Sequence, residues 1–154
     1  MKDKRPSWDD YFIELAQIVK KRSNCLRPPY GALIVKDFRI LSSGYNGTPH
    51  GIKNCFAGGC ERCARRQKGE IQTHEYQESC ICIHAEQNAI IQAAYQGSST
   101  KGATMYSTIS PCSSCAKMII NAGIMRYVYH QLHHDTEGIK LLKSASVNVN
   151  KYSK

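Results

Sequence analysis

The chain has 154 residues, of which 42% are hydrophobic and 21% are charged, and its formal net charge is +9. No apolar run reaches the roughly 20 residues that cross a bilayer, and the charged N-terminus lacks the apolar segment of a secretion signal. This excludes a membrane partner and argues for one globular domain in the reducing cytoplasm.

The first elements along the chain are a helix and two strands. Ser7 can cap a helix in which apolar residues from Trp8 to Val19 recur at helical spacing, with acids in the first turn where the helix dipole favours them. Residues 30–37 and 39–46 have the composition of strands and are joined tightly enough to form a hairpin.

The next segment, from residue 48 to about residue 79, is rich in glycine, cysteine and charge and has no hydrophobic periodicity. It is too long for a plain loop in a compact domain unless something pins it, and its cysteines are the obvious candidates. We therefore expect a single domain over residues 1–154 with a cysteine-rich insertion at about 48–82.

The second half alternates helices and strands. The predicted elements are helix 84–97, strand 103–110, helix 111–123, strand 126–131, a further helix, and a weak strand 146–150. This order predicts an α/β fold, a three-layer α/β/α sandwich with a central mixed sheet of about five strands.

Eight cysteines in an intracellular chain indicate metal binding rather than disulfides. Two pairs, Cys60 with Cys63 and Cys112 with Cys115, have CxxC spacing. Residues three apart on a helix share a face, so Cys112 and Cys115 can hold one ion together.

A catalytic zinc site is predicted where two helices begin. His84 with Cys112 and Cys115 would leave a tetrahedral zinc ion one open position for water, whose pKa falls to about 7 on the metal. Glu86 lies beside a ligand without being one, so it can take the proton of that water and pass it to a leaving group. The alternatives are a core histidine with an exposed glutamate, and a structural zinc knuckle; the presence of both halves favours the enzyme.

The two halves match the signature H-x-E…P-C-x-x-C of zinc-dependent base deaminases. From about Trp8 to Leu142 the chain resembles the cytidine deaminase-like superfamily, and most closely its deoxycytidylate (dCMP) deaminases. The segments that carry the resemblance are RSNC (22–25), GALIVKD (31–37), GYNGTPHG (44–51), NCFAGGCERC (54–63), CICIHAEQNAI (80–90), GATMYSTISPCSSCAKMIINAGI (102–124) and YVYH (127–130).

The resemblance implies zinc-dependent hydrolysis of dCMP to dUMP and ammonia, which supplies dUMP for thymidylate synthesis. It implies nucleotide contacts from Asn46, Ala85, Ser110 and Tyr129. Asn46 precedes a glycine, a pair that also favours turns. Tyr129, or Tyr127 near it, could stack on the base, but core packing explains both tyrosines equally well.

The resemblance also implies a homo-oligomer, with a hexamer favoured, that is activated by dCTP and inhibited by dTTP. Mg²⁺ is a further candidate ion beside the effector nucleotide. The candidate effector-binding residues are Gly44, Tyr45, Asn46, Gly47 and Gly51.

Related deaminases carry a structural zinc, and this chain has six cysteines for one or two such ions. One partition is a closed site of Cys60, Cys63, Cys80 and Cys82, which leaves Cys25 and Cys55 to pair with His74 or His50. The other keeps Cys25, Cys55, His74 and Cys82 together and leaves Cys60, Cys63 and Cys80 without a named fourth ligand.

Two other functions fit parts of the sequence. The charge of +9 is compatible with a deaminase of tRNA adenosine or of another base, and with a non-catalytic, zinc-stabilised nucleic-acid-binding module. The basic residues form no long block, so we do not expect a nucleic-acid partner. The shuttle acid Glu86 argues against a module without catalysis, and His133 and His134 are expected on the surface.

Overall fold

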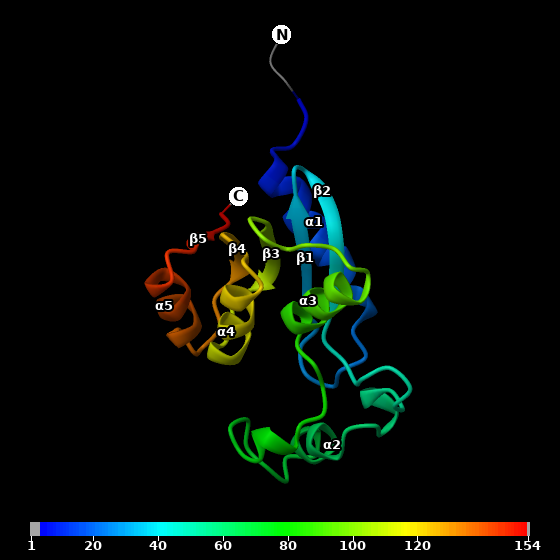
Figure 1. The fold of residues 1–154 in the computed structure, drawn as a ribbon. Coiled ribbons are helices and arrows are strands. Elements are labelled where there is room, and N and C mark those ends of the chain that lie inside the picture. The colour runs from blue at the N-terminus through cyan, green and yellow to red at the C-terminus, as the bar shows by residue number, and fades with distance from the viewer. Residues whose placement is uncertain (1–3, 154) are drawn as a thin grey trace.

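The computed structural model describes residues 4–153; residues 1–3 and 154, the ends of the expected 1–154 domain, lie outside the described residues. Five strands form one mixed sheet in the order β2-β1-β3-β4-β5 (Figure 1). The strands are β1 Gly31–Lys36, β2 Arg39–Tyr45, β3 Thr104–Ile109, β4 Arg126–Gln131 and β5 Asn148–Lys151. Strand β1 is antiparallel to β2 and β3, whereas β3, β4 and β5 are parallel to one another.

Helices cover both faces of this sheet. The helices are α1 Trp8–Val19, α2 Glu61–Gln67, α3 Ala85–Tyr95, α4 Ser113–Asn121 and α5 Glu137–Ser144, with short 3₁₀ turns at η1 Lys20–Arg22, η2 Cys55–Ala57 and η3 Gln77–Ser79. Helix α1 packs on one face, and α3, α4 and α5 contribute to the core on the other. The predicted α/β/α sandwich with a mixed five-stranded sheet is confirmed.

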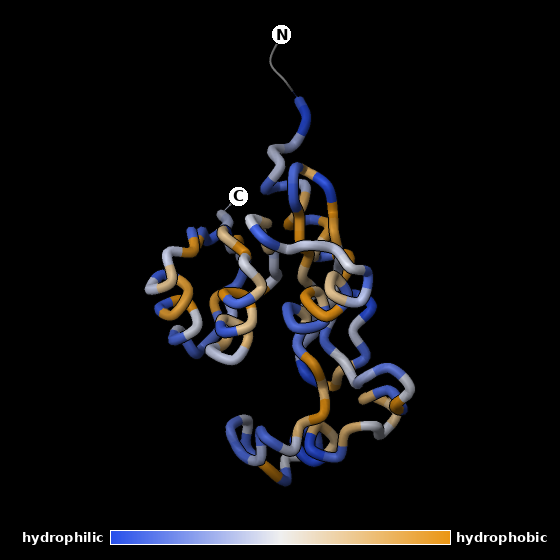
Figure 2. Tube along the Cα trace, in the orientation of Figure 1, coloured by the Kyte–Doolittle hydropathy of each residue, from blue (hydrophilic) through white to orange (hydrophobic). Residues whose placement is uncertain are grey.

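Strand β1 shows why both faces must be covered. Ala32 and Ile34 lie in the core with α3 and α4, and Leu33 and Val35 lie in the core with α1. Successive side chains of a strand point to opposite faces, so a continuous apolar run buries both. Figure 2 shows hydrophobic residues along these central strands and hydrophilic ones at the N-terminal end.

Helix α1 begins at a capping box and is tied to the sheet. The predicted cap is confirmed: the amide of Asp10 donates to Ser7 Oγ at 3.1 Å, and the amide of Ser7 donates to the Asp10 carboxylate at 3.1 Å. The neighbouring Asp9 accepts two hydrogen bonds from Arg126, at 2.6 and 2.8 Å, and one from the Tyr106 hydroxyl at 2.8 Å. These contacts hold the first turn of α1 against β3 and β4.

The cysteine-rich segment lies apart from the sheet, at the lower end of Figure 1. Its buried cluster consists of Cys55, Cys60, Cys63 and Cys82, with Leu26 among its partly buried neighbours. The absence of hydrophobic periodicity in this segment has a structural reason, because its core is built from sulfur rather than from aliphatic side chains. Within residues 4–153, no helix is long and apolar enough to cross a membrane.

Two glycines allow close approach behind the helices that carry the predicted ligands. A Cβ on Gly44 of β2 would lie 2.3 Å from the Ala85 carbonyl oxygen and 2.4 Å from the Ala89 nitrogen of α3. A Cβ on Gly138 of α5 would lie 2.1 Å from the Pro111 carbonyl oxygen, next to the start of α4. Each contact is with backbone, which cannot rotate away as a side chain would.

We therefore expect Gly44→Ala to lower the free energy of unfolding by about 1–3 kcal/mol, because overpacking must displace α3 from β2. Ser43→Ala, at the exposed neighbouring position of β2, is the matched control and should stay within about 0.5 kcal/mol of the parent. Urea unfolding of the three proteins measures this. Equal midpoints for the two variants would contradict a close contact at Gly44.

Candidate active site and metal sites

Two helix N-termini bring the predicted catalytic ligands together. His84 is the N-cap of α3, Cys112 is the N-cap of α4, and Cys115 lies in the first turns of α4. His84 Nδ1 lies 3.5 Å from Cys112 Sγ and 3.3 Å from Cys115 Sγ. Two ligands of a tetrahedral zinc ion with ordinary Zn–N and Zn–S bonds are about 3.5 Å apart, so these three residues fit zinc.

The protonation of the trio also suits a cation. A hydrogen bond from the Cys115 thiol, and another from the His84 ring, lower the pKa of Cys112 to about 3. The contact with the Cys112 thiolate raises the pKa of both Cys115 and His84. The group thus contains one thiolate, at Cys112. The protons on Cys115 and His84 are the ones that a divalent metal ion would displace.

The carboxyl group of Glu86 is buried next to this group, with 3% of the residue exposed. Its Oε2 lies 3.8 Å from Cys115 Sγ, and the Tyr127 hydroxyl lies 3.1 Å from its Oε1. Burial raises the pKa of Glu86. A carboxyl whose pKa is moved toward neutrality can both accept and return a proton at physiological pH.

Tyr127 is a partner of Glu86 that the sequence did not reveal. Its hydroxyl oxygen lies 3.1 Å from Glu86 Oε1 and 2.8 Å from the Ile109 carbonyl oxygen, and its single proton can serve only one of them at a time. An ionised Glu86 can accept that proton, whereas a protonated Glu86 can donate to the phenol oxygen while Tyr127 donates to Ile109. Both states of the acid therefore keep a hydrogen bond.

A small cavity of about 60 Å³ lies against Glu86 and His84. Three residues predicted to contact the nucleotide line it: Asn46, Ala85 and Ser110. The fourth, Tyr129, is not among the residues that line this cavity in the described part of the chain. Tyr129 instead packs in the core, with its ring centroid 6.4 Å from that of Tyr127.

Asn46 is held in place by hydrogen bonds to Ser23, Tyr30 and Pro28. Its Oδ1 accepts from Ser23 Oγ and from the Tyr30 amide, both at 2.8 Å, and its Nδ2 donates to the Pro28 carbonyl at 3.0 Å. The Ser23 hydroxyl also lies 2.8 Å from the Asn46 backbone carbonyl oxygen, so its one proton is shared between the two oxygens. One N–H of the amide remains for a ligand.

A larger cavity of about 660 Å³ adjoins the small one, and Arg27, Tyr30 and His133 line both. Arg66 lines the larger cavity. Sequence reasoning missed Arg27 and placed His133 on the surface. Neither lies in a recognisable motif, and their position depends on loops that fold toward the site.

The five candidate effector residues do not form one surface. Gly44 is covered by α3, and Gly47 exchanges backbone hydrogen bonds with Ile83, at 3.2 and 2.8 Å, next to His84. Tyr45 is exposed, and Gly51 lies in a turn at a φ of 83° with open space around it. The segment thus runs from the surface to the wall of the small cavity, which Asn46 lines.

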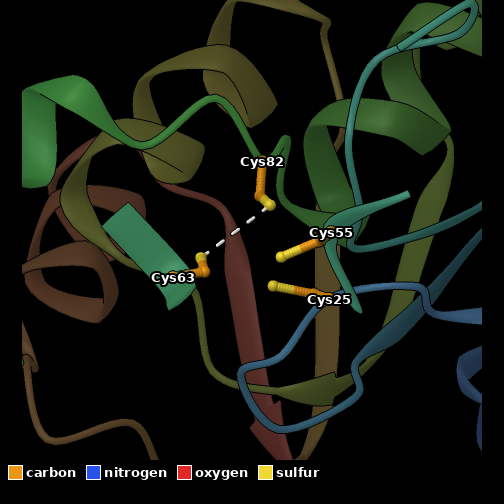
Figure 3. A group of neighbouring side chains, drawn as sticks. All are labelled: Cys25, Cys55, Cys63 and Cys82. Carbon is orange, nitrogen blue, oxygen red and sulfur yellow. Dashed lines mark hydrogen bonds between the residues drawn. The ribbon is translucent and has the colours of Figure 1, made fainter. Parts of the chain in front are cut away.

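The six remaining cysteines come together in space: five lie in the cysteine-rich segment, and Cys25 joins them from the loop that precedes β1. Their sulfur atoms form two groups of four, each with all members within 4.8 Å of one another: Cys25, Cys55, Cys63 and Cys82, and Cys60, Cys63, Cys80 and Cys82. Figure 3 shows the first group converging on one point. The group of Cys60, Cys63, Cys80 and Cys82 is one of the two predicted sites. The other predicted site was Cys25, Cys55, His74 and Cys82, and the structure has Cys63 in place of His74 there. In the described residues His74 and His50 are exposed and belong to neither group.

Comparisons with known proteins agree with this geometry. A family model described as the cytidine and deoxycytidylate deaminase zinc-binding region matches residues 6–131. The chain is 40% identical over 150 residues to deoxycytidylate deaminase of Saccharomyces cerevisiae, which covers 97% of this chain and 46% of the relative. It is 40% identical over 129 residues to that of Mycobacterium phage D29, which covers 81% of this chain and 95% of the relative.

A crystal structure of dCMP deaminase from the cyanophage S-TIM5, in complex with dCMP and dUMP, matches with a TM-score of 0.78 and 32% identity over 97% of this chain and 100% of that chain. The chain spans about half the length of the two yeast relatives that it matches. Because the family model matches residues 6–131 and these relatives are 32–40% identical, the chain belongs to the cytidine and deoxycytidylate deaminase family.

Proposed function

We propose that this chain catalyses the hydrolytic deamination of dCMP to dUMP and ammonia. The observation that carries the proposal is the Glu86 carboxyl, buried at the wall of a cavity and directly beside the ligand group His84, Cys112 and Cys115. The relatives named deoxycytidylate deaminase, and the cyanophage enzyme in complex with dCMP and dUMP, support the choice of substrate.

The chemistry follows from the residues around Glu86. When bound by the three ligands, zinc supplies Lewis-acid activation of a water molecule for attack on C4 of the cytosine ring. Glu86 would take one proton from that water and deliver it to N3, and would then move the second proton from the new hydroxyl on C4 to the amine, which leaves as ammonia. Tyr127 supports the acid in both protonation states and keeps its carboxyl plane fixed.

The same cavities suggest how the nucleotide is held. Asn46 offers its remaining amide N–H, while Ala85 and Ser110 line the space for the base. Tyr30 is a better candidate than Tyr129 for contact with the ring, because it lines both cavities. Arg27 and Arg66 supply positive charge for the phosphate group.

We further propose the regulation that the resemblance implies, with dCTP as activator, dTTP as inhibitor and Mg²⁺ accompanying the effector. Support comes from the path of residues 44–51, since Asn46 lines the substrate cavity and Gly47 pairs with Ile83 beside His84. A nucleotide bound to this segment could therefore alter the site. Exposed apolar residues of α3, Ile91 and Tyr95, could serve contacts in a hexamer.

The proposed setting follows from the reaction. The product dUMP would feed thymidylate synthesis, and eight cysteines in thiol form suit a reducing compartment such as the cytoplasm. We propose one deaminase domain over residues 1–154, in which the folding of the cysteine-rich insertion at about 48–82 depends on bound metal.

Glu86→Gln should lower the rate of dCMP deamination by at least about 10²-fold, because the amide cannot move the proton. Ammonia release from dCMP, CMP, dCTP and cytidine, each with and without added dCTP and Mg²⁺, measures both activity and preference. Zinc content is the control and should equal that of the parent. Retained turnover in the variant would contradict the shuttle, and zinc-replete parent protein inactive on every nucleotide would redirect the search to adenosine in RNA.

Tyr127→Phe should lower kcat about tenfold and leave KM nearly unchanged, because Glu86 loses its buried hydrogen-bond partner. Tyr106→Phe is the matched control, since that hydroxyl is also part of a buried tyrosine but donates to Asp9. The control should lose stability without losing kcat. Equal kcat values for the two variants would show that Tyr127 has only a structural role.

A further inference from the structure

The two four-cysteine groups share two members. Cys63 and Cys82 belong to both groups, Cys25 and Cys55 belong only to the first, and the second is completed by Cys60 and Cys80. Two tetrahedra of sulfur atoms that share one edge have this pattern. The shared edge is the Cys63–Cys82 pair, drawn as a dashed line in Figure 3.

The sulfur distances match two zinc ions. With a Zn–S bond of about 2.3 Å, the edge of a tetrahedral thiolate site is about 3.8 Å long. The Sγ atoms of Cys63 and Cys82 are 4.0 Å apart, and those of Cys63 and Cys80 are 3.8 Å apart. Within each group the four sulfur atoms all lie within 4.8 Å of one another.

We propose that the six cysteines hold two zinc ions in one binuclear cluster, in which the thiolates of Cys63 and Cys82 bridge the two metals. Cys25 and Cys55 are the terminal ligands of one ion. Cys60 and Cys80 are the terminal ligands of the other. Six cysteines around two zinc ions occur in small DNA-binding modules, so the stoichiometry has a chemical precedent.

A single ion would leave two of the six sulfur atoms without a role. An ion bound in the first group would leave Cys60 and Cys80 as thiols in contact with metal-bound thiolates. An ion bound in the second group would leave Cys25 and Cys55 as thiols without a metal. Cys55 and Cys60 are 0% and 1% exposed, so one buried thiol would be stranded in either case. Two separate four-cysteine sites would need eight cysteines, and only six converge there.

The surroundings suit a cluster that carries negative charge. Six thiolates and two divalent ions leave a net charge of about −2. The amide of Leu26 donates to Cys55 Sγ and that of Arg27 donates to Cys25 Sγ, both at 3.4 Å. The guanidinium of Arg27 is close to the cluster, and its buried Nε has no other partner within the described chain.

The cluster would also join the cysteine-rich segment to the active site. Cys82 precedes His84 by two residues, and Arg27 lines both cavities, the smaller of which Glu86 also lines. Since sulfur makes up most of the segment's core, the bound metals supply the interactions that aliphatic residues supply elsewhere. This inference rests on the cysteine geometry and does not depend on the proposed substrate.

Zinc analysis of chelator-free, zinc-replete protein tests the stoichiometry. We expect about three zinc ions per chain in the parent and about two in Cys112→Ser/Cys115→Ser, which removes only the catalytic group. Two ions in the parent and one in the double variant would overturn the proposal, because a single ion would then occupy the six cysteines. Copper in place of zinc would also overturn it.

Exchange with ¹¹³Cd tests the bridge on the parent protein. We expect two sulfur-rich ¹¹³Cd resonances that are split by coupling to each other, because only shared thiolates connect the two ions. Two uncoupled resonances would mean separate sites and would overturn the bridge. Cys60→Ser should lose one ion and Cys63→Ser should lose both; if either variant fails to fold, the spectrum of the parent still decides.

Discussion

The burial of an acidic group beside three candidate metal ligands is the constraint on which the rest of this structure depends. An isolated buried carboxylate costs several kcal/mol, so Glu86 needs partners that fit it in every state. The N-terminus of α3 and the Tyr127 hydroxyl provide them. Helix α3 must therefore begin at His84, and β4 must present Tyr127 from the sheet beneath it.

The packing behind the site is built from small residues for this reason. Helix α3 turns Ala85, Ala89 and Ala93 toward the sheet and lies directly on Gly44, so its backbone comes close to β2. Helix α5 supports the start of α4 in the same way through Gly138. Larger side chains at these places would move the helix N-termini, and with them the distances among His84, Cys112 and Cys115.

The cysteine-rich segment follows a different rule of stability. Residues 48–82 bury few aliphatic groups, and their core consists mostly of sulfur. The ordinary hydrophobic effect then contributes little, and metal coordination is the interaction that can order the segment. Because Arg27 and Cys82 connect it to the cavities, the order of this segment bears directly on their shape.

Much of the fold could be predicted because it depends on short-range pattern. The capping box at Ser7, the apolar run of β1 and the helix start at His84 are each determined within a few residues, and the structure shows all three. The segment around α2 could not be assigned in the same way, since it has no hydrophobic period to read.

The sequence by itself determined the donor types of the candidate site, their CxxC and HxE spacing, and the acid beside them, since neighbours on one helix turn need no distant partner. Tertiary structure alone decided which remote groups meet there. In the folded chain Tyr127 rather than solvent lies beside Glu86, and Tyr129 packs in the core. His74 is exposed, and Cys63 and Cys82 belong to both sulfur groups. These outcomes depend on how separate loops and strands converge, which no local spacing encodes.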